Sequence, residues 1–515
     1  MIKMSKLAEV FGLGRKVMQT QPTFVSRVNA LYQNLRNSTA VQKINAFLLS
    51  PWGLAMLAVC TLCAFSFGLE LVFYTLVILL TLYICVFCDD LTALMPLFIF
   101  CYVTAGPTSN PGKTETSFFY SGGTYILILA AVAIVAVFTR IALDKSMGYK
   151  KLFTQKRSLL LGMLVLSLAY FLSGIGRNGY GEIVWKHLRF ALLQFFSILL
   201  LYFLFSATVK WNENSGTYFA WVGVMMGILV SFEVVAIYLQ MDVIVDGVIL
   251  RDRIDAGWGC YNNVGAMITM SIPFAFYLAC KSKRPYLFLA LGTLLLGGVF
   301  LSGSRGSMLG GVFVYLLAIV YTFLYADEKR AFRISVYVLI GIGIVGALCC
   351  WDLVEKLFAS IPGIINGSSS SEGIEFNDSG RLSIYKEGLK VFTKYPIFGE
   401  SFFPENYAPW EYSELEQVSA IIPPRWHNTI VQLLASCGLV GMLAYGFHRF
   451  QTIKLICKKP TRLNMCIAFS ILGLLAMSML DCHFFNIGPV LFYSMALAVA
   501  EFADDKIPLK KIRTR

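Results

Sequence analysis

Residues 51–87 read PWGLAMLAVCTLCAFSFGLELVFYTLVILLTLYICVF. The stretch holds two apolar runs, each close to the roughly 17 to 25 residues with which a helix crosses the hydrocarbon core of a bilayer. A cleavable signal peptide has one shorter apolar core followed by a cleavage site, whereas here a second run follows the first at once. The stretch therefore predicts two retained transmembrane helices in a multi-pass membrane protein.

Similar apolar runs recur along nearly the whole chain as far as residue 503, which leaves no room for a separate soluble domain. We expect an all-α integral membrane protein with about fourteen transmembrane helices. The predicted spans lie at residues 48–67, 69–88, 91–106, 122–143, 158–175, 189–208, 216–240, 263–280, 285–302, 307–326, 333–351, 427–447, 463–481 and 486–503.

The composition agrees with this class. The 515 residues are 57% hydrophobic and 14% charged, with a mean hydropathy of +0.68, whereas soluble domains carry about 25% charged residues. The net charge of +13 could suggest a nucleic-acid partner, but the positive residues fall between apolar runs, where they orient membrane proteins. Most cysteines lie inside apolar runs, where a thiol behaves as a small hydrophobic group rather than as a metal ligand. We therefore expect no nucleic-acid partner and no metal site.

Lysine and arginine set the predicted orientation, because cytoplasmic loops carry an excess of both. Counting on from the basic N-terminus, four of the expected cytoplasmic loops are rich in them, at 145–157, 281–284, 329–333 and 449–462, so both termini are expected in the cytoplasm. The predicted segments are a basic cytoplasmic tail at 1–45, transmembrane helices 1–11 at 46–351, a long extracytoplasmic loop at 352–426, transmembrane helices 12–14 at 427–503 and a basic cytoplasmic tail at 504–515.

The long loop contains one predicted helix. Apolar residues at Leu382, Tyr385, Leu389 and Phe392 recur at helical spacing, and Pro396 ends the pattern. A loop of this length is usually functional or disordered.

Three stretches on the predicted outer face carry polar groups that could do chemistry: SGSRGSMLGG at 302–311, GRLSIYKEGLKVFTKYPIFGESFF at 380–403 and WHNTIVQLLASCGLVGMLAY at 426–445. Each also has a structural interpretation. Arg305 could be an arginine reaching to the membrane interface, Arg381 a solvated surface charge, and His427 a bystander in an interfacial aromatic belt.

In this order and at these separations, the three stretches resemble the bacterial O-antigen ligase family, which includes O-antigen polymerases. The resemblance spans roughly residues 210–500, and YNNVGAMITMSIPF at 261–274 also looks like a family helix start. Phe398-Gly399-Glu400 departs from it, since many relatives have Gly-x-Gly there.

The resemblance implies a protein of the bacterial cytoplasmic (inner) membrane, with a fold like that of C-type glycosyltransferases and a glycan donor on a polyprenyl (undecaprenyl) diphosphate. The acceptor would be a lipid, a glycan or a wall polymer, and no cofactor is implied. Arg305 and Arg381 would bind the diphosphate, and His427 would accept a proton or position a substrate. Asn428 and Gln432 would bind sugar, or would hold helices together. No outward DxD motif or carboxylate cluster is present to bind magnesium, so we expect a metal-independent reaction.

A transporter or lipid-linked oligosaccharide flippase is the alternative. Glu233 lies within a predicted span, where carboxylates are costly and often functional. No internal repeat of the kind common in transporters is visible. Four further groups on the outer face have no motif around them: Arg251, Arg253, Asp255 and His483.

Overall fold

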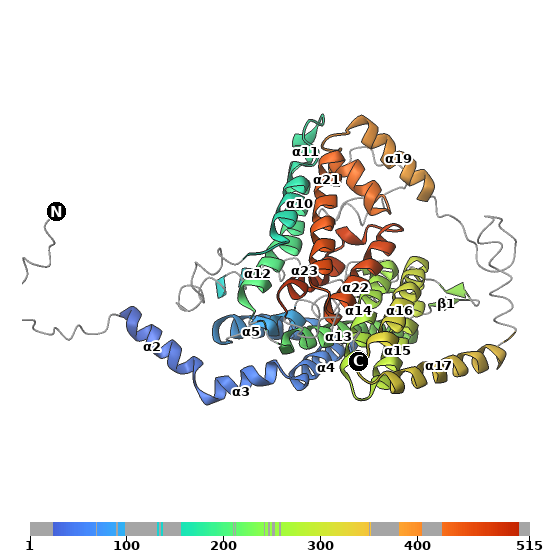
Figure 1. Cartoon of the computed structure of the whole chain (residues 1–515). Helices are drawn as coiled ribbons and strands as arrows, with labels where there is room; N and C mark the ends of the chain where they lie inside the picture. The colour runs from blue at the N-terminus through green and yellow to red at the C-terminus, as the bar shows by residue number, and fades with distance from the viewer. Residues whose placement is uncertain are drawn as a thin grey trace, which may run out of the picture.

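The computed structural model describes residues 24–67, 69–88, 91–97, 131–132, 135–136, 156–209, 211, 213–240, 243–245, 248–249, 253–256, 259–349, 351, 381–403 and 425–503. Within these residues the chain is almost entirely helical (Figure 1). The four short strands pair as two antiparallel hairpins, β1 (Ile244–Val245) with β2 (Val248–Ile249) and β3 (Asp255–Ala256) with β4 (Gly259–Cys260).

The N-terminal helices are α2 (Phe24–Arg36), α3 (Thr39–Leu48), α4 (Pro51–Phe67), α5 (Glu70–Phe87), η1 (Leu91–Ala93), α10 (Leu160–Leu172), α11 (Tyr180–Phe195), η3 (Phe196–Leu200), α12 (Leu201–Thr208) and α13 (Glu213–Gln240). The C-terminal helices are α14 (Tyr261–Lys281), α15 (Pro285–Leu301), α16 (Arg305–Tyr325), α17 (Lys329–Cys349), α19 (Arg381–Lys394), α21 (Thr429–Lys458), α22 (Arg462–Ser478), η5 (His483–Phe485) and α23 (Ile487–Phe502).

Several of these helices are long and apolar enough to cross a membrane. Five qualify singly: Ile183–Ala207, Asn214–Leu239, Tyr261–Lys281, Arg305–Tyr325 and Thr429–Lys458. A sixth results if α3 and α4, bent by 69°, are counted as one span. The prediction of a multi-pass helical membrane protein is confirmed. The number of about fourteen spans stays a prediction, and the spans expected at 91–106 and 122–143 lie largely outside the described residues.

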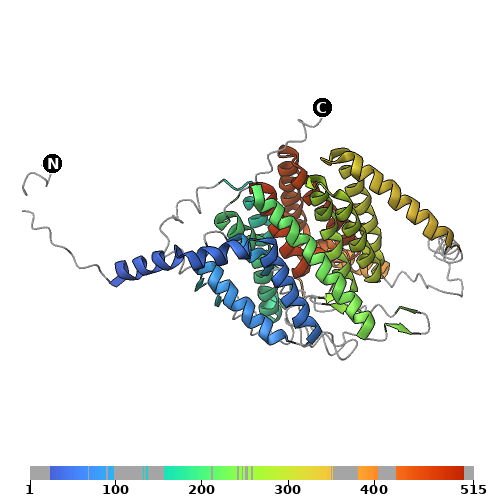
Figure 2. The same cartoon turned by 90° about the horizontal axis from the view of Figure 1, so that it is seen from below.

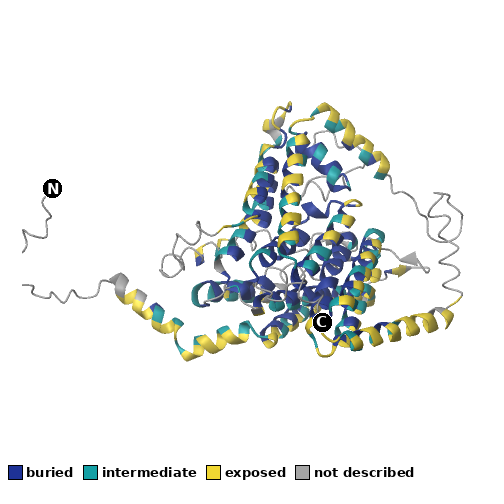
Figure 3. Ribbon diagram, viewed as in Figure 1, coloured by how far each residue is buried: buried dark blue, intermediate teal, exposed yellow. Residues whose placement is uncertain are grey.

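Helix α14 forms the centre of the bundle, where α13, α15, α16 and α22 pack around it (Figures 1 and 3). Its candidate span is completely buried, as expected for a helix that is apolar on every face. Small residues allow the close approach: a Cβ placed on Gly265 would lie 2.5 Å from Cβ of Ser307 on α16. The start of α16, which carries Arg305, is thus held tightly against α14.

The helix expected in the long loop is confirmed as α19, which ends before Pro396. It lies on α21, where Ile384 packs in a small cluster with Trp426, Val431 and Ala435. Gly388 is at the contact, since a Cβ there would lie 2.5 Å from Cγ1 of Val431. Of the predicted loop 352–426, residues 352–380 and 404–424 lie outside the described residues.

Gly388→Val is therefore expected to lift α19 off α21, because the added methyl groups have no room beside Val431 and Trp426. Amide hydrogen exchange of residues 381–394 should rise at least several-fold in the full-length protein, while exchange in α14 stays unchanged. Leu389→Val, at a half-exposed position next to it, is the matched control and should exchange like the parent. Equal exchange in both variants would contradict the close packing.

Helix α21 breaks at Gly438, whose φ of 62° and ψ of −156° lie outside the helical region. Residues 396–401, here called the inserted segment, fill the break. The amides of Glu400 and Ser401 donate to the carbonyls of Ala435 and Ser436 at 2.8 and 3.1 Å, and the amide of Leu439 donates to the carbonyl of Pro396 at 2.8 Å. The backbone groups freed by the break are thereby paired with protein, as a low-dielectric surrounding requires.

Beyond the break, α21 continues past the predicted span end at residue 447 to Lys458. Arg449, which the sequence placed in a cytoplasmic loop, lies on this helix instead. Its guanidinium carbon is 4.3 to 4.9 Å from the ring centroids of Tyr445, Phe484 and Tyr493. Stacking on aromatic faces lets an arginine be covered without a carboxylate partner.

Candidate functional site

His427 lies at the start of α21, directly after the long loop. Its backbone adopts a left-handed φ of 48°, which is uncommon for a residue with a side chain. The hydroxyl of Tyr385 on α19 donates to the His427 carbonyl at 3.0 Å and helps to hold this conformation. The imidazole is 35% exposed, so a substrate can reach it.

Asp481, in the short segment between α22 and η5, faces the imidazole. Its Oδ1 lies 3.4 Å from Nδ1 of His427, and its side chain is 5% exposed. The same oxygen accepts from the amide of Cys482 at 2.7 Å, while Oδ2 accepts from Nδ2 of Asn262 at 2.7 Å. The carboxylate is thus fixed on both oxygens and presents its charge to His427.

Asn262 carries the network on to α16. Its Oδ1 accepts from the hydroxyl of Ser304 at 2.8 Å, and Ser304 caps the N-terminus of α16 by accepting from the amide of Ser307. Arg305 is the next residue and the first of that helix. The start of α16 also packs closely against the segment of Asp481, because a Cβ on Gly306 would lie 3.2 Å from Cδ1 of Leu480, the neighbour of Asp481. The start of α16 and the His427–Asp481 pair therefore belong to one cluster.

The groups around Asp481 favour its ionised form. Burial alone would raise its pKa, but the contact with His427, together with the neighbouring His483 and Arg425, outweighs burial and holds the pKa well below its usual range. Asp481 is therefore ionised at neutral pH. Arg425, two residues before His427, had not been singled out from the sequence.

His483 is a second imidazole in the cluster. Burial lowers its pKa to about 4, and the charges of Arg425 and Arg381 act in the same direction while Asp481 opposes them. The ring is therefore neutral at neutral pH. Its Nδ1 lies 3.2 Å from Oδ1 of Asn263 on α14, which fixes its orientation.

Arg381 is the first residue of α19 and lies near the same cluster. Its charge acts on His483, and it partly offsets the rise that burial causes in the pKa of Tyr385. The structure therefore brings Arg381 and His427 to one region, and the Ser304–Asn262–Asp481 network joins the helix start of Arg305 to it.

Asn428 and Gln432 are engaged by protein groups. Asn428 caps α21 through Oδ1, which accepts from the amides of Ile430 and Val431, and its Nδ2 donates to the Met479 carbonyl at 2.8 Å. Gln432 is buried, with Oε1 accepting from the Trp426 amide at 2.9 Å. Both side chains thus have hydrogen-bond partners within the protein, and their role in binding sugar stays a prediction.

The departure at Phe398-Gly399-Glu400 has a structural basis. Glu400 is buried, and one of its carboxylate oxygens lies 4.0 Å from Nη2 of Arg177, which lies between α10 and α11. Nη1 of Arg177 also donates to the carbonyls of Glu400 and Phe403 at 3.1 and 2.8 Å. A glycine at 400 would leave the guanidinium without this carboxylate, so the Glu and Arg177 act as a pair.

Glu233 lies inside α13 and is 1% exposed. Within the described part of the chain, neither of its carboxylate oxygens has a hydrogen-bond partner. Among the other groups on the expected outer face, Arg253 lies just before β3, while Arg251 and the side chain of Asp255 lie outside the described residues.

Residues 288–446, which contain Arg305, Arg381 and His427, match the family model described as O-antigen ligase. This match supports the O-antigen ligase family for this part of the chain. The resemblance expected from the three stretches is confirmed. No curated protein matches the chain.

The match supports a membrane enzyme that transfers glycans, of the ligase or polymerase type, and it implies a lipid-linked glycan donor. The match ends at residue 446, so Asp481 and His483 lie beyond it, and Asn262 lies before its start. The partners of His427 therefore come from chain segments on either side of the matched region. Their sequence signal was weak: a short polar interruption, LDCHFFN at 480–486, between two apolar runs.

Proposed function

We propose that this protein moves a glycan from a polyprenyl diphosphate carrier to an acceptor hydroxyl on the outer face of the bacterial cytoplasmic membrane. The observation that carries the proposal is that Asp481 lies 3.4 Å from Nδ1 of His427 and is hydrogen-bonded through Asn262 to Ser304, beside Arg305. In this arrangement the accessible imidazole of His427 faces the carboxylate of Asp481, which hydrogen bonds hold in place. Both lie next to the helix start that carries Arg305.

In the proposed reaction, the acceptor oxygen attacks the anomeric carbon of the donor sugar. The bond from this carbon to the phosphate oxygen breaks, and polyprenyl diphosphate leaves with the electron pair. A single displacement of this kind inverts the anomeric configuration. The hydroxyl proton passes to His427, whose Nδ1 faces Asp481, so that Nε2 is the nitrogen to receive it.

Arg305 and Arg381 are proposed to bind the diphosphate. Negative charge grows on the departing phosphate oxygen, and a guanidinium fixed in a water-poor site stabilises that charge in the transition state. Arg425 adds a third positive charge near Asp481. In this proposal Asn428 and Gln432 shape the acceptor side of the site and contact the sugar only where their protein hydrogen bonds leave a lone pair or a proton.

Transfer is expected to survive removal of divalent cations, because arginines take the role that magnesium has in many phosphate-dependent enzymes. Purified protein in proteoliposomes, given a polyprenyl diphosphate glycan and an acceptor, should turn over in excess EDTA within about twofold of its untreated rate. If activity were lost in EDTA and restored by magnesium, the metal-independent mechanism would be wrong, but the proposal of glycan transfer would be unaffected.

Ligase and polymerase share this donor and differ in the acceptor. The same assay, run with a lipid acceptor, a second repeat unit or a wall polymer, distinguishes them by which product forms.

The transport alternative rests on the buried Glu233. Movement of a lipid-linked glycan across the vesicle membrane, with no transfer to any of the three acceptors, would decide for it.

A further inference from the structure

Helices α2 and α3 at the start of the described chain carry charge of one sign. Residues 24–48 contain Arg27, Arg36 and Lys43 and no acidic side chain. Arg27 and Lys43 are exposed, and the guanidinium of Arg36 lies 6.0 Å from the ring centroid of Tyr32. Figures 1 and 2 show the two helices extending from the bundle beside α4.

Hydrogen bonds fix these helices to the end of α5. The hydroxyl of Tyr32 donates to the Val86 carbonyl at 2.7 Å, and Nδ2 of Asn45 donates to the Phe87 carbonyl at 3.3 Å. The hydroxyl of Tyr83 donates to Oδ1 of Asn45 at 3.1 Å. Since α5 ends at Phe87, helices α2 and α3 lie at the level where this apolar helix stops.

The direction of α3 also places it at the membrane depth at which α5 ends. It is bent by 69° from α4, and none of its residues is buried, whereas α4 buries Leu54 and Leu57 in the core. A helix that leaves a membrane span at such an angle runs close to the membrane plane. It can then place apolar side chains toward hydrocarbon and basic groups toward lipid headgroups.

The exposed apolar side chains meet this requirement. Figure 3 shows yellow along much of α2 and α3, and the large apolar residues that are exposed include Leu31 at 61%, Leu35, Ile44 and Phe47. Trp52, one residue into α4, is 78% exposed. Several large apolar side chains exposed on neighbouring helices indicate a contact with lipid or with another protein. The basic residues on the same helices favour an anionic occupant.

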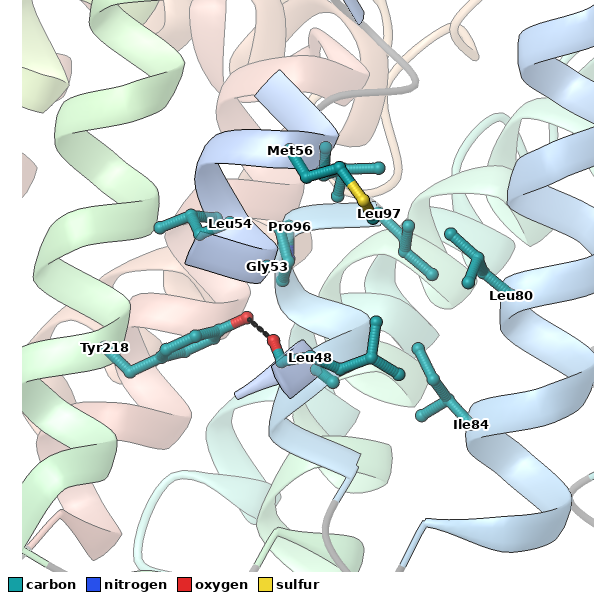
Figure 4. Close-up of a pocket in the computed structure, with 11 residues that line it drawn as sticks. Leu48, Gly53, Leu54, Met56, Leu80, Ile84, Pro96, Leu97 and Tyr218 are labelled. Carbon is teal, nitrogen blue, oxygen red and sulfur yellow. Dashed lines mark hydrogen bonds between the residues drawn. The ribbon is translucent and has the colours of Figure 1, made fainter. Parts of the chain in front are cut away.

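An apolar cleft at the bend between α3 and α4 agrees with lipid. It is small, about 20 Å³, and is lined by Leu48, Leu54 and Met56, with Leu80 and Leu97 across it (Figure 4). The hydroxyl of Tyr218, which also lies on its wall, already donates to the Leu48 carbonyl at 3.2 Å. Apart from this engaged hydroxyl the lining side chains are apolar, so they suit contact with hydrocarbon.

We propose that α2 and α3 form a docking surface for anionic phospholipids in the leaflet at which α5 ends. Arg27, Arg36 and Lys43 bind the headgroup phosphates, and the apolar side chains enter the acyl region. This surface is independent of the glycan-transfer site and of its chemistry.

Amide hydrogen exchange on the full-length protein in nanodiscs tests the surface. Each basic residue near an anionic membrane contributes about fivefold in binding. Residues 24–48 should therefore exchange at least tenfold more slowly in phosphatidylcholine with phosphatidylglycerol than in phosphatidylcholine alone. The variant R27Q/R36Q/K43Q should lose this difference. At about 0.5 M salt the parent should lose most of it as well.

The matched control is K386Q/K390Q/K394Q, which removes three exposed lysines from α19, and it should keep the full lipid effect. Exchange in α14, unchanged in every variant, reports an intact fold. Equal exchange of residues 24–48 in the two lipids, or an undiminished effect in R27Q/R36Q/K43Q, would overturn the proposal and would favour a protein partner on this face.

Discussion

Replacing Arg305 or Arg381 with alanine is expected to slow glycan transfer by roughly ten-fold to several-hundred-fold. Each change removes a charge-assisted contact to the leaving diphosphate, which contributes about 1.5 to 3 kcal/mol or more in a dry site. Arg→Lys should restore only part of the rate, because an ammonium cannot make the two parallel hydrogen bonds of a guanidinium to phosphate oxygens. The measurement is kcat/KM for the lipid-linked donor in proteoliposomes.

Lys386→Ala is the matched control for Arg381, since it removes a positive charge from the exposed face of the same helix. It should leave the rate within about twofold, as surface charges away from a site have small effects. All variants should insert and show the parent's exchange in α14. Full activity of both alanine variants at equal protein level would remove the arginines from the mechanism.

Asp481→Asn is expected to reduce kcat by about 100-fold to 10,000-fold, similar to His427→Ala, because both changes remove the same proton acceptor. An amide of nearly the same size keeps the packing but no longer presents an anion to Nδ1 of His427. With its NH₂ toward Nδ1, the ring would carry its proton on Nε2 and could not accept another there. The KM for the donor should change little in either variant.

The double variant separates this account from a loss of structure. If the two residues act as one unit, Asp481→Asn combined with His427→Ala should be about as slow as His427→Ala alone. Asp327→Asn is the matched control, since it breaks the 2.7 Å ion pair with Arg462 and lies outside the polar network of His427. A normal kcat in Asp481→Asn would show that the carboxylate does not support the imidazole, and His427→Gln at the parent rate would exclude proton transfer.

The parts of the molecule that could be predicted from the sequence are those encoded locally. The apolar runs are long enough to specify spans one by one, and the spacing of Leu382, Tyr385 and Leu389 before Pro396 specifies α19 in the same way. Arg305, Arg381 and His427 were found because each lies in a short stretch with a family resemblance.

Asp481 could not be identified as the partner of His427, because the two residues are 54 positions apart and meet only through helix packing. The break in α21 was also missed. Gly438 lies in an apolar run that is otherwise regular, and only the inserted segment from a different part of the chain makes the break stable. For Asn428 the sequence allowed two interpretations. Its position beside His427 suggested a contact with the substrate, but its position directly before a helix also suits an N-cap, which is the role it has in the structure.

The inserted segment also constrains the order of events during biosynthesis. The hydroxyl of Ser173, at the end of α10, donates to the Ser436 carbonyl beside the break, and the amide of Gly174 donates to the Phe398 carbonyl at 2.9 Å. The two serines are 263 residues apart. At about 5 to 20 residues per second of synthesis, the end of α10 waits on the order of 10 to 50 seconds for its partners. During that interval its polar groups need water or the insertion machinery, and a chain that stops before residue 398 leaves them without these partners.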